Sequence, residues 1–516
     1  MTPHRPNILL VMADQLGACW TGQYAQTAAR TPYLDRLATE GIVFERMYCN
    51  SPICVASRAS MLAGRLISAI GAYDNGSEFP ASRPTFCHYL RLAGYRTVLA
   101  GKMHFIGPDQ LHGFAERLTT DIYPASLDWT PDWRREPVHN PGTSVREVRD
   151  SGVAARTMQM DYDEEVHGHA VRQLYDFARA RQDGDQRPWF MCVSYTQPHD
   201  PFVTTPEYWN RFEGVAIPAP TPPPAEPSPA YDQWLNIHHE LDLYTLTEAQ
   251  IAAARRAYFG MVAQIDDLLG DLLKHLERAG MGQETLVIFT SDHGEMLGER
   301  GMWYKRTMYE PSSRVPFLAR WPQHIPPGRR ESRVASLVDL FATFSELAGA
   351  QHPDRSPPLS DGESLVPLLL GRAVPWKDMA VCEYLGEGVA APVRMLVQAD
   401  HKLVYVHGQP DQLYDLTADP GEQQNLALYP AQAAILHRLK AALLANWDPV
   451  AIHRAVLSSQ AERRAVIAAL KLDTVTSWDY QPVDDAGNRY VRHRNAQQTA
   501  AAARVPGVYD QHKEEP

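Results

Sequence analysis

Cys54 and Arg58 lie four positions apart in the segment Ser-Pro-Ile-Cys-Val-Ala-Ser-Arg, and together they indicate chemistry on an anion. The small residues between them lead into a stretch that can start a helix, where backbone N–H groups and Arg58 would face a bound oxyanion. A cysteine in that place can act as a covalent nucleophile on an ester of the anion. The same cysteine is also consistent with a buried, unreactive core residue.

Two pairs of residues with metal-binding side chains each follow an apolar run that predicts a buried strand. They are Asp14 with Gln15, and Asp292 with His293. Carboxylate and amide oxygens with an imidazole suit one divalent cation, Ca²⁺ before Mn²⁺ or Mg²⁺. Either pair alone is also typical of an ordinary strand end or helix cap, so the hypothesis depends on their meeting in space.

Several basic residues follow other predicted strands or stand just past the second acidic pair. They are Lys102, His104, His199 and Lys305. Together with Arg58 they would surround a tetrahedral anionic transition state with fixed positive charge. Each of them alone is typical of a solvated or structural residue.

Composition excludes several classes of function. The chain has 516 residues and a net charge of −12, from 49 basic and 61 acidic residues, so nucleic acid is not expected as its partner. No apolar run reaches the roughly 18 residues of a membrane span, and the run at residues 8–12 is too short for an export signal. The six cysteines are scattered without a Cys-x-x-Cys pair, which predicts reduced thiols and a cytoplasmic location.

The order of the apolar runs predicts an α/β fold. Strand-like runs stand at residues 7–12, 96–100, 189–195 and 285–290. Helical periodicity is found at residues 31–40, 169–180 and 247–279. Such alternation predicts a large, mostly parallel sheet sandwiched by helices. Functional residues are then expected beyond the carboxyl ends of the strands, where Asp14 and Asp292 would meet.

The length of the chain favours more than one unit. We expect a catalytic domain at residues 1–375, a smaller C-terminal α+β subdomain at 376–470 and an extended tail at 471–516. The subdomain is expected from three strand-like pieces and two helices, at residues 379–384, 394–398, 402–407, 430–446 and 451–470. Proline-rich stretches at 201–232 and 351–360 are expected to be surface loops.

The segment around Cys54 resembles the Cys-x-Pro-Ser-Arg signature of type I sulfatases, with Ala56 in place of the usual proline and Ala63 where threonine is frequent. The resemblance implies the alkaline-phosphatase-like fold and conversion of Cys54 to formylglycine by a formylglycine-generating enzyme. It implies a catalytic set and a metal-binding set. The catalytic set is Cys54, Arg58, Lys102, His104, His199 and Lys305, and the metal-binding set is Asp14, Gln15, Cys54, Asp292 and His293.

The family's chemistry implies a division of roles among these residues. One hydroxyl of the formylglycine hydrate attacks sulfur, and the alcohol leaves with a proton from His199 or Lys305. The second hydroxyl then loses a proton to His104, which expels sulfate and restores the aldehyde.

Further segments resemble the choline sulfatase branch of this family. They are residues 119–125, 129–133, 291–305, 383–388 and 477–492. The branch implies hydrolysis of choline O-sulfate in osmoprotectant metabolism. A quaternary ammonium has no N–H, so aromatic faces and carboxylates must hold it. Trp129 and Glu383 are the expected partners, with Trp133 and His139 as further candidates.

The tail resembles the C-terminal extension of the same branch. It implies a homo-oligomer, a dimer or a tetramer, in which Asp484 or Asp485 reaches the ammonium pocket of a neighbouring subunit.

Two alternatives stay open. An arylsulfatase or a phosphonate monoester or phosphodiester hydrolase would share the nucleophile and the metal pairs. A catalytically silent protein that binds choline esters would result if Ala56 prevented the conversion of Cys54.

Overall fold

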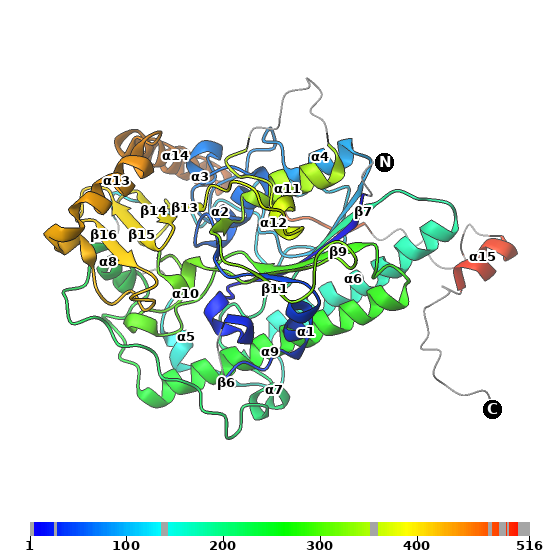
Figure 1. Cartoon of the computed structure of the whole chain (residues 1–516), viewed down its shortest axis with the longest axis horizontal. Helices are drawn as coiled ribbons and strands as arrows, with labels where there is room; N and C mark the ends of the chain where they lie inside the picture. Colours follow the sequence, from blue (N-terminus) through cyan, green and yellow to red (C-terminus); the bar gives the residue numbers. More distant parts are fainter. Residues whose placement is uncertain are drawn as a thin grey trace.

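The centre of the protein is an eight-stranded sheet with the order β11-β2-β10-β9-β1-β7-β4-β5 (Figure 1). The computed structural model describes residues 5–24, 28–135, 143–350, 360–472, 477–483, 492 and 495–503. The strands are β11 (Arg329–Glu331), β2 (Ile42–Phe44), β10 (Phe317–Arg320), β9 (Thr285–Ser291), β1 (Asn7–Ala13), β7 (Trp189–Ser194), β4 (Arg96–Gly101) and β5 (Glu116–Arg117). The five strands from β9 to β5 run parallel, and β10 is antiparallel to both of its neighbours. The predicted mostly parallel sheet is confirmed.

Helices cover both faces of this sheet because its central strands are apolar on both sides. In β1, Leu10 and Met12 belong to one buried cluster, and Leu9 and Val11 to another. The first cluster includes α2 (Cys54–Ala63), α4 (Phe86–Leu92) and α11 (Asp339–Ala348). The second includes α1 (Pro32–Glu40), α6 (Met158–Gln182) and α9 (Glu248–Arg278), which lie on the opposite face in Figure 1.

Helix α6 begins 11 residues before the predicted start at residue 169 (169 − 158). The side chain of Thr157 caps it by accepting a hydrogen bond from Met160 N. Its first turns are rich in acidic residues, which hide the apolar periodicity although Met160 and Val166 are buried. Helix α9 matches its prediction, since Thr247 and Gln250 form a capping box at its start.

The carboxyl ends of the central strands meet at one edge of the sheet. Asp14 follows β1, Asp292 follows β9 and Lys102 follows β4, as the alternation predicts. The edge is tight at Gly101, which has φ +105°. A Cβ atom there would lie 2.0 Å from the carbonyl oxygen of Ser194 on β7, so only glycine allows this approach.

The smaller C-terminal subdomain is built on a second, antiparallel sheet, seen at the left of Figure 1. It contains β13 (Met379–Tyr384), β14 (Val393–Gln398), β15 (His401–Val406) and β16 (Gln412–Asp415), followed by α13 (Ala433–Leu444) and α14 (Pro449–Leu470). Strand β16 was not expected from the sequence. Lys402 Nζ ties the subdomain to the larger domain through Glu310 at 2.8 Å, and it pairs with Glu422 at 2.7 Å.

Shorter elements fill the connections. They are β3 (Met47–Tyr48) with β12 (Ala335–Ser336), β6 (Gly152–Val153) with β8 (Val203–Thr204), and the helices α3 (Ile67–Ile70), α5 (Arg146–Arg149), α7 (Pro206–Asn210), α8 (Ala230–His238), α10 (Glu310–Ser313) and α12 (Val366–Leu369). Part of the stretch expected as a loop at 201–232 therefore folds into β8, α7 and the start of α8. The loop expected at 351–360 lies almost wholly outside the described residues.

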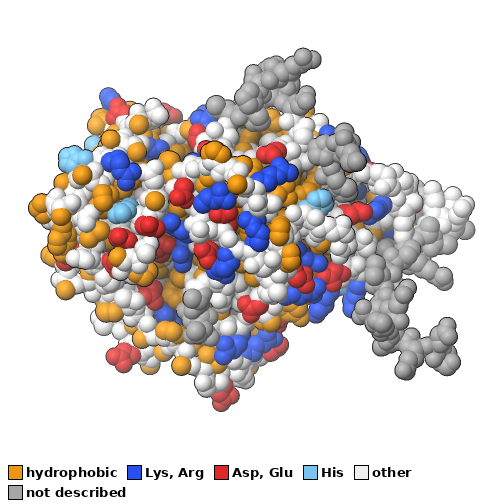
Figure 2. Space-filling model, viewed as in Figure 1, with side chains coloured by type: hydrophobic (Ala, Val, Ile, Leu, Met, Phe, Trp, Pro, Cys, Tyr) orange, Lys and Arg blue, Asp and Glu red, His pale blue; other side chains and the backbone are white. Residues whose placement is uncertain are grey.

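On the face shown in Figure 2, charged side chains of both signs are interspersed. The helix α15 (Ala496–Ala503) contacts the end of α6, where Arg179 Nε donates to the carbonyl oxygen of Ala502 at 3.1 Å. Among the residues described, none of the helices combines the length and the apolarity that crossing a bilayer requires.

The cap of α9 gives a test of the fold. Thr247→Ala removes the side-chain oxygen that accepts from Gln250 N, so it should lower the free energy of unfolding by about 1 kcal/mol. Thr245→Ala is the matched control, since Thr245 is exposed and lies two residues before the capping residue Thr247. Urea unfolding followed by far-UV circular dichroism measures both. Equal effects of the two substitutions would contradict the assignment of the cap.

Candidate functional site

The predicted nucleophile stands at the first position of a buried helix. Helix α2 begins at Cys54, after Ile53 in an extended conformation, and all ten of its residues are buried. Asn75 Oδ1 accepts from Val55 N at 3.1 Å, which satisfies one of the free N–H groups of the first turn. Ser57 Oγ donates to the carbonyl oxygen of Asp292 at 2.6 Å. The start of the helix is thereby held against the end of β9.

The sequence predicted that Arg58 faces a bound anion, but the structure does not place it there. Its side chain is fully buried among the strand ends. Its Nε donates to Asp292 Oδ2 at 2.8 Å and its Nη2 to Asp14 Oδ2 at 3.1 Å. Its Nη1 donates to the carbonyl oxygen of Lys102 at 2.6 Å and to Ser194 Oγ at 2.8 Å. These contacts use all three nitrogen atoms of the Arg58 guanidinium, so Arg58 holds the carboxylates in place.

Four of the predicted metal ligands come together in one cluster. Ligand atoms of Asp14, Cys54, Asp292 and His293 all lie within 4.8 Å of one another, and all four residues are buried. Cys54 Sγ lies 3.2 Å from His293 Nε2 and 3.9 Å from Asp14 Oδ1. Two carboxylates and an imidazole around one point fit a divalent cation. The structure therefore brings Asp14 close to the pair Asp292 and His293, although they are far apart in the sequence.

Electrostatics within the cluster favour the ionised form of Asp14. Burial alone would raise the pKa of Asp14, but Lys102, His199 and Arg58 outweigh it and hold that pKa well below the usual range. Burial lowers the pKa of His293, although Asp292 opposes it. An anionic carboxylate and a neutral imidazole are the forms that bind a metal.

Gln15, the fifth predicted ligand, adopts a left-handed backbone conformation with φ +65°. Its backbone N–H donates to Asp292 Oδ1 at 3.2 Å. Its side-chain Nε2 donates to Glu295 Oε2 at 2.5 Å, and its Oε1 accepts from Lys305 Nζ. The amide oxygen is therefore engaged by an ammonium group in this structure.

Lys102 and His104 share the loop after β4, as expected. Lys102 Nζ pairs with Asp14, lies 3.6 Å from Cys54 Sγ and stands 4.4 Å from the centre of the Tyr123 ring. Burial would lower the pKa of Lys102, but Asp14 and Cys54 raise it above its ordinary value. The ring of His104 stacks on Tyr123 with their centres 4.8 Å apart.

His104 is the site's unpaired polar ring. Neither of its buried nitrogens has a hydrogen-bond partner among the described residues. Burial, and then the charge of Lys102, lower the pKa of His104 well below its ordinary value, so the ring is neutral and can accept a proton. The backbone N–H groups of Met103 and His104 both donate to Asp121 Oδ2, at 2.9 and 2.8 Å, which fixes the loop.

His199 and Lys305 form a pair; His199 comes after β7 and Lys305 after β9. Lys305 Nζ lies 2.6 Å from His199 Nε2. His199 Nδ1 is 2.8 Å from the carbonyl oxygen of Asp200, so we assign its proton to Nδ1 and the acceptor role to Nε2. Asp200 Oδ1 also lies 3.8 Å from Lys305 Nζ. An ammonium donor is thus held next to an imidazole.

A cavity of about 520 Å³ opens onto these groups. The residues around it that bear on the chemistry are Cys54, His104, Tyr123, Trp129, Glu147, His199, Asp200, Lys305, Arg306 and Glu387. Trp129 is 44% exposed, and its ring meets those of His104 and Tyr123 edge-on, with centres 5.3 and 5.4 Å apart. Cys54, the predicted nucleophile, therefore lines a cavity that aromatic side chains also line.

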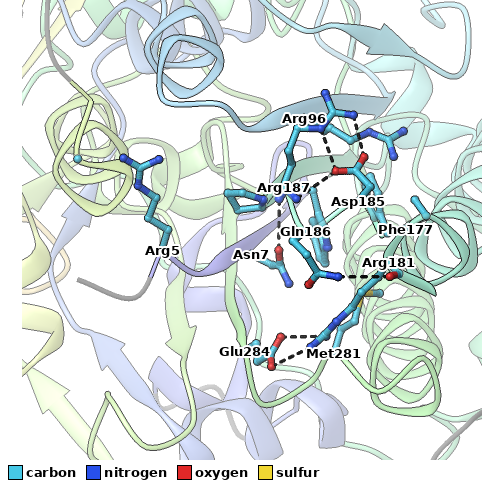
Figure 3. A pocket seen from close by; sticks show the side chains of 14 residues that line it. Arg5, Asn7, Arg96, Phe177, Arg181, Asp185, Gln186, Arg187, Met281 and Glu284 are labelled. Atoms are coloured by element: carbon cyan, nitrogen blue, oxygen red, sulfur yellow. Dashed lines mark hydrogen bonds and ion pairs between the residues drawn. The ribbon is translucent and has the colours of Figure 1, made fainter. Parts of the chain in front are cut away.

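A larger hollow, of about 730 Å³, lies at the amino ends of the strands and is shown in Figure 3. Its charged groups are largely paired with one another. Arg181 pairs with Glu284 at 3.0 Å, and Arg187 with Asp185 at 2.7 Å. This hollow lies away from the carboxyl ends that carry the metal cluster, so we place the chemistry in the smaller cavity.

Two predicted substrate residues are not brought to the cavity. Glu383 is fully buried within β13, where its carboxylate accepts from Ser68 N and Oγ, both at 2.9 Å, and pairs with Arg394 at 3.2 Å. Trp133 is also buried, and its Nε1 donates to the carbonyl oxygen of Gly386 at 2.7 Å. His139 lies outside the described residues.

Glu387, four residues after Glu383, is one of the acids that line the cavity. Its Oε1 accepts from Arg306 Nη2 at 3.0 Å. Its Oε2 is buried and has no hydrogen-bond partner in the described part of the chain. The sequence analysis favoured Glu383 in the segment Glu-Tyr-Leu-Gly-Glu-Gly, although that residue falls in the strand expected at 379–384, and it did not consider Glu387 in the loop after that strand. Tyr123 was missed similarly, although it lies within the singled-out segment 119–125.

Three family models match the chain. The model described as Sulfatase matches residues 6–350, and that described as N-sulphoglucosamine sulphohydrolase, C-terminal, matches residues 298–448. The model described as Choline sulfatase enzyme C terminal matches residues 454–504. The first of these spans more than half of the chain.

Individual relatives agree. The chain is 39% identical to a choline-sulfatase of Rhizobium meliloti (strain 1021), over 98% of this chain and 99% of that protein. It is 28% identical to an arylsulfatase of Clostridium perfringens, over 82% of this chain and 90% of that protein. Among solved structures, a phosphonate monoester hydrolase of Agrobacterium radiobacter superposes with a TM-score of 0.68 at 25% identity, covering 87% of this chain and 96% of that one.

The cluster predicts how metal binding responds to substitution. Asp292→Asn removes a buried ligand charge, so it should weaken binding of Ca²⁺ to chelator-treated protein on the order of 100-fold, as measured by isothermal titration calorimetry. Asp128→Asn is the matched control, since Asp128 lines the cavity but lies outside the cluster. Unchanged affinity in the Asp292 variant would exclude this cluster as the metal site.

Proposed function

The chain belongs to the sulfatase family, and from that premise we infer that it is a sulfuric ester hydrolase that converts choline O-sulfate and water into choline and sulfate. The observation that carries the choice of substrate is the cavity itself. It places the exposed indole of Trp129 and the unpaired carboxylate oxygen of Glu387 around the same hollow as Cys54. An aromatic face with a carboxylate is what a quaternary ammonium requires.

The sulfate half of the ester would be held at the carboxyl ends of the strands. Asp14, Asp292 and His293 would hold a divalent cation, which supplies Lewis-acid polarisation of the sulfate oxygens. A formylglycine hydrate, if Cys54 is converted, would supply one hydroxyl for attack on sulfur and a second for release of sulfate. Lys102, 3.6 Å from Cys54 Sγ, adds positive charge where the sulfate oxygens gain negative charge.

Departure of choline needs a proton on its oxygen as the S–O bond breaks. Lys305 and His199 are positioned to supply it, because the ammonium lies 2.6 Å from the imidazole and both side chains line the cavity. We assign the general acid to this pair.

Release of sulfate needs a base. His104 suits that role, because its ring is neutral and neither nitrogen is engaged by another described residue. It would take a proton from a hydroxyl group held at position 54 and would later return that proton to solvent.

Recognition of the alcohol half is assigned to Trp129 and Glu387, in place of the Glu383 expected from the sequence. The ammonium carries no N–H, so it cannot satisfy an acceptor by hydrogen bonding and is attracted by charge and by the ring face. The Oε1 atom of Glu387 accepts from Arg306, while its Oε2 atom has no hydrogen-bond partner in the described part of the chain.

Several finer points belong to the same proposal. We assign Ca²⁺ as the cation, maturation by a formylglycine-generating enzyme and a cytoplasmic location in osmoprotectant metabolism. We keep the division into a catalytic domain (1–375), a subdomain (376–470) and a tail (471–516) that forms a homo-oligomer. Asp484 and Asp485 lie outside the described residues, so their part in the pocket of a neighbouring subunit stays a prediction. His139 also lies outside them, and its contact with the substrate stays a prediction.

The second candidate function is an arylsulfatase or a phosphonate monoester hydrolase. The named activities of two similar proteins favour it, since an arylsulfatase and a phosphonate monoester hydrolase share the scaffold. The site proposed for the ammonium group, formed by Trp129 and Glu387 and called the cation pocket below, distinguishes this function from the leading proposal, because aryl esters carry no ammonium.

Conversion of Cys54 is tested by mass. Replacement of the thiol by an aldehyde makes the intact protein about 18 Da lighter than its unmodified sequence. We expect that shift in the peptide that spans residues 51–58, with turnover of choline sulfate proportional to the converted fraction. Cys54→Ala, which cannot be converted, is the control. Full activity with an unshifted mass would disprove the conversion, and an unshifted mass without activity would establish the silent binding protein.

The substrate class is tested by the ratio of two activities. Trp129→Ala and Glu387→Gln should each lower kcat/KM for choline sulfate by about 10- to 30-fold, since a desolvated cation–π contact contributes roughly 2 kcal/mol. Hydrolysis of 4-nitrophenyl sulfate should fall by less than about 3-fold. Trp209→Ala, on α7 outside the cavity lining, controls for loss of an aromatic side chain. Equal losses on both esters would favour the arylsulfatase.

A further inference from the structure

Helix α14 carries two buried polar residues on its inner face. Three of its residues are buried, namely Val456, Gln460 and Arg463, and two of these are polar. Gln460 and Arg463 are three positions apart, so they lie on the same side of the helix. Buried polar groups are unfavourable unless they are paired, so their partners indicate what the helix holds.

Arg463 joins two loops at the cavity. Its Nη1 and Nη2 donate to the two oxygens of Asp74, both at 2.7 Å, and Nη1 also donates to Thr130 Oγ1 at 3.0 Å. Thr130 is the neighbour of Trp129. The loops touch at Gly76, where a Cβ atom would lie 2.3 Å from the backbone nitrogen of Thr130. A bidentate pair of this kind fixes orientation as well as distance.

Gln460 reaches the other side of the cation pocket. Its Oε1 accepts from Trp133 N at 3.0 Å. Trp133 Nε1 in turn donates to the carbonyl oxygen of Gly386 at 2.7 Å, and Gly386 is bonded to Glu387. The indole that sequence reasoning assigned to substrate therefore links α14 to the loop that carries the cavity carboxylate.

The same face of α14 also contacts the nucleophile helix. Ile467, four positions beyond Arg463, packs with Trp478 against Val55, Ile106 and Leu127. Val55 follows Cys54, and its N–H donates to Asn75, which follows Asp74. One rigid helix thus contacts the two loops of the cation pocket and the helix of the nucleophile.

We propose that α14 sets the distance between Trp129 and Glu387, with Arg463 and Gln460 as positioning residues that determine specificity for an ester with a quaternary ammonium group. This inference rests on the proposed function. The groups assigned to sulfate follow β1, β4, β7 and β9, and none of them contacts Arg463 or Gln460 in the described structure. Loss of either positioning contact should therefore displace the cation pocket and leave the sulfate-handling groups in place.

The test compares substitutions on α14. Arg463→Met removes the guanidinium but keeps an apolar stem, and Gln460→Met does the same for the amide. Arg463→Lys restores one donor without the fork. Arg454→Met is the matched control, since Arg454 is exposed on the same helix. Each variant is assayed well below its unfolding temperature with choline sulfate and with 4-nitrophenyl sulfate.

We expect kcat/KM for choline sulfate to fall by about 10- to 100-fold in Arg463→Met and Gln460→Met, mainly through KM, because an error of about 1 Å in placement has effects of this size. Hydrolysis of the aryl ester should fall by no more than about 3-fold, and Arg463→Lys should recover part of the loss. Equal losses on both substrates, or an effect on kcat alone, would overturn the positioning role.

Hydrogen exchange gives a reading that does not depend on the substrate. In Arg463→Met, amide exchange should rise in peptides that cover residues 74–77 and 127–133, and stay unchanged in α6 and α9. A uniform rise would mean that Arg463 only stabilises the fold and would overturn the proposal. If the wild-type protein hydrolyses the aryl ester but not choline sulfate, the proposed function is wrong, while the exchange pattern still decides whether α14 positions the cavity.

Discussion

A single buried guanidinium, that of Arg58, joins the ends of four neighbouring strands. It donates to the carboxylates that follow β1 and β9, to the carbonyl oxygen that follows β4 and to the hydroxyl that ends β7. With Lys102 it balances the charges of Asp14 and Asp292 in an interior where removing one partner of a buried pair costs about 3–5 kcal/mol. Because Arg58 lies on the helix that begins at Cys54, the contacts that close this end of the sheet also fix the nucleophile against the metal cluster.

The site divides between rigid and adjustable parts of the fold. The ends of the central strands, together with the start of α2, carry the groups that we assign to the sulfate half of the ester. The loop after β5 and the loop after β13 supply Trp129 and Glu387, and neither residue belongs to the sheet that holds the nucleophile. Such loops can vary while the strand ends stay in place, so one scaffold can accept different alcohol groups.

The sequence predicted the parts of the site that follow from the topology of a parallel sheet. It predicted less well the parts that depend on the direction of a side chain. Parallel strands put their carboxyl ends on one edge, so Asp14 and Asp292 could be brought together although 278 positions separate them (292 − 14). The direction of Arg58 could not be read in the same way, because a residue near a helix start can face the ligand or the strand ends. Glu383 and Glu387 belong to one short segment, and only the pairing of β13 with β14, which sets Glu383 opposite Arg394, decides which one is enclosed. The contacts of α14 join residues more than 300 positions apart, and no local pattern reports them.

The burial of the helix that begins at Cys54 bears on the order of folding and of the proposed modification of Cys54. Cys54 is 1% exposed, and the nine residues after it in the helix are buried as well. If Cys54 is converted as proposed, the modifying enzyme would need access to a stretch that the folded protein encloses. Oxidation of the thiol would then come before the surrounding domain folds. The time available is set by the competition between catalysis by the modifying enzyme and the folding of the surrounding domain, so a chain that folds early would be left permanently unreactive.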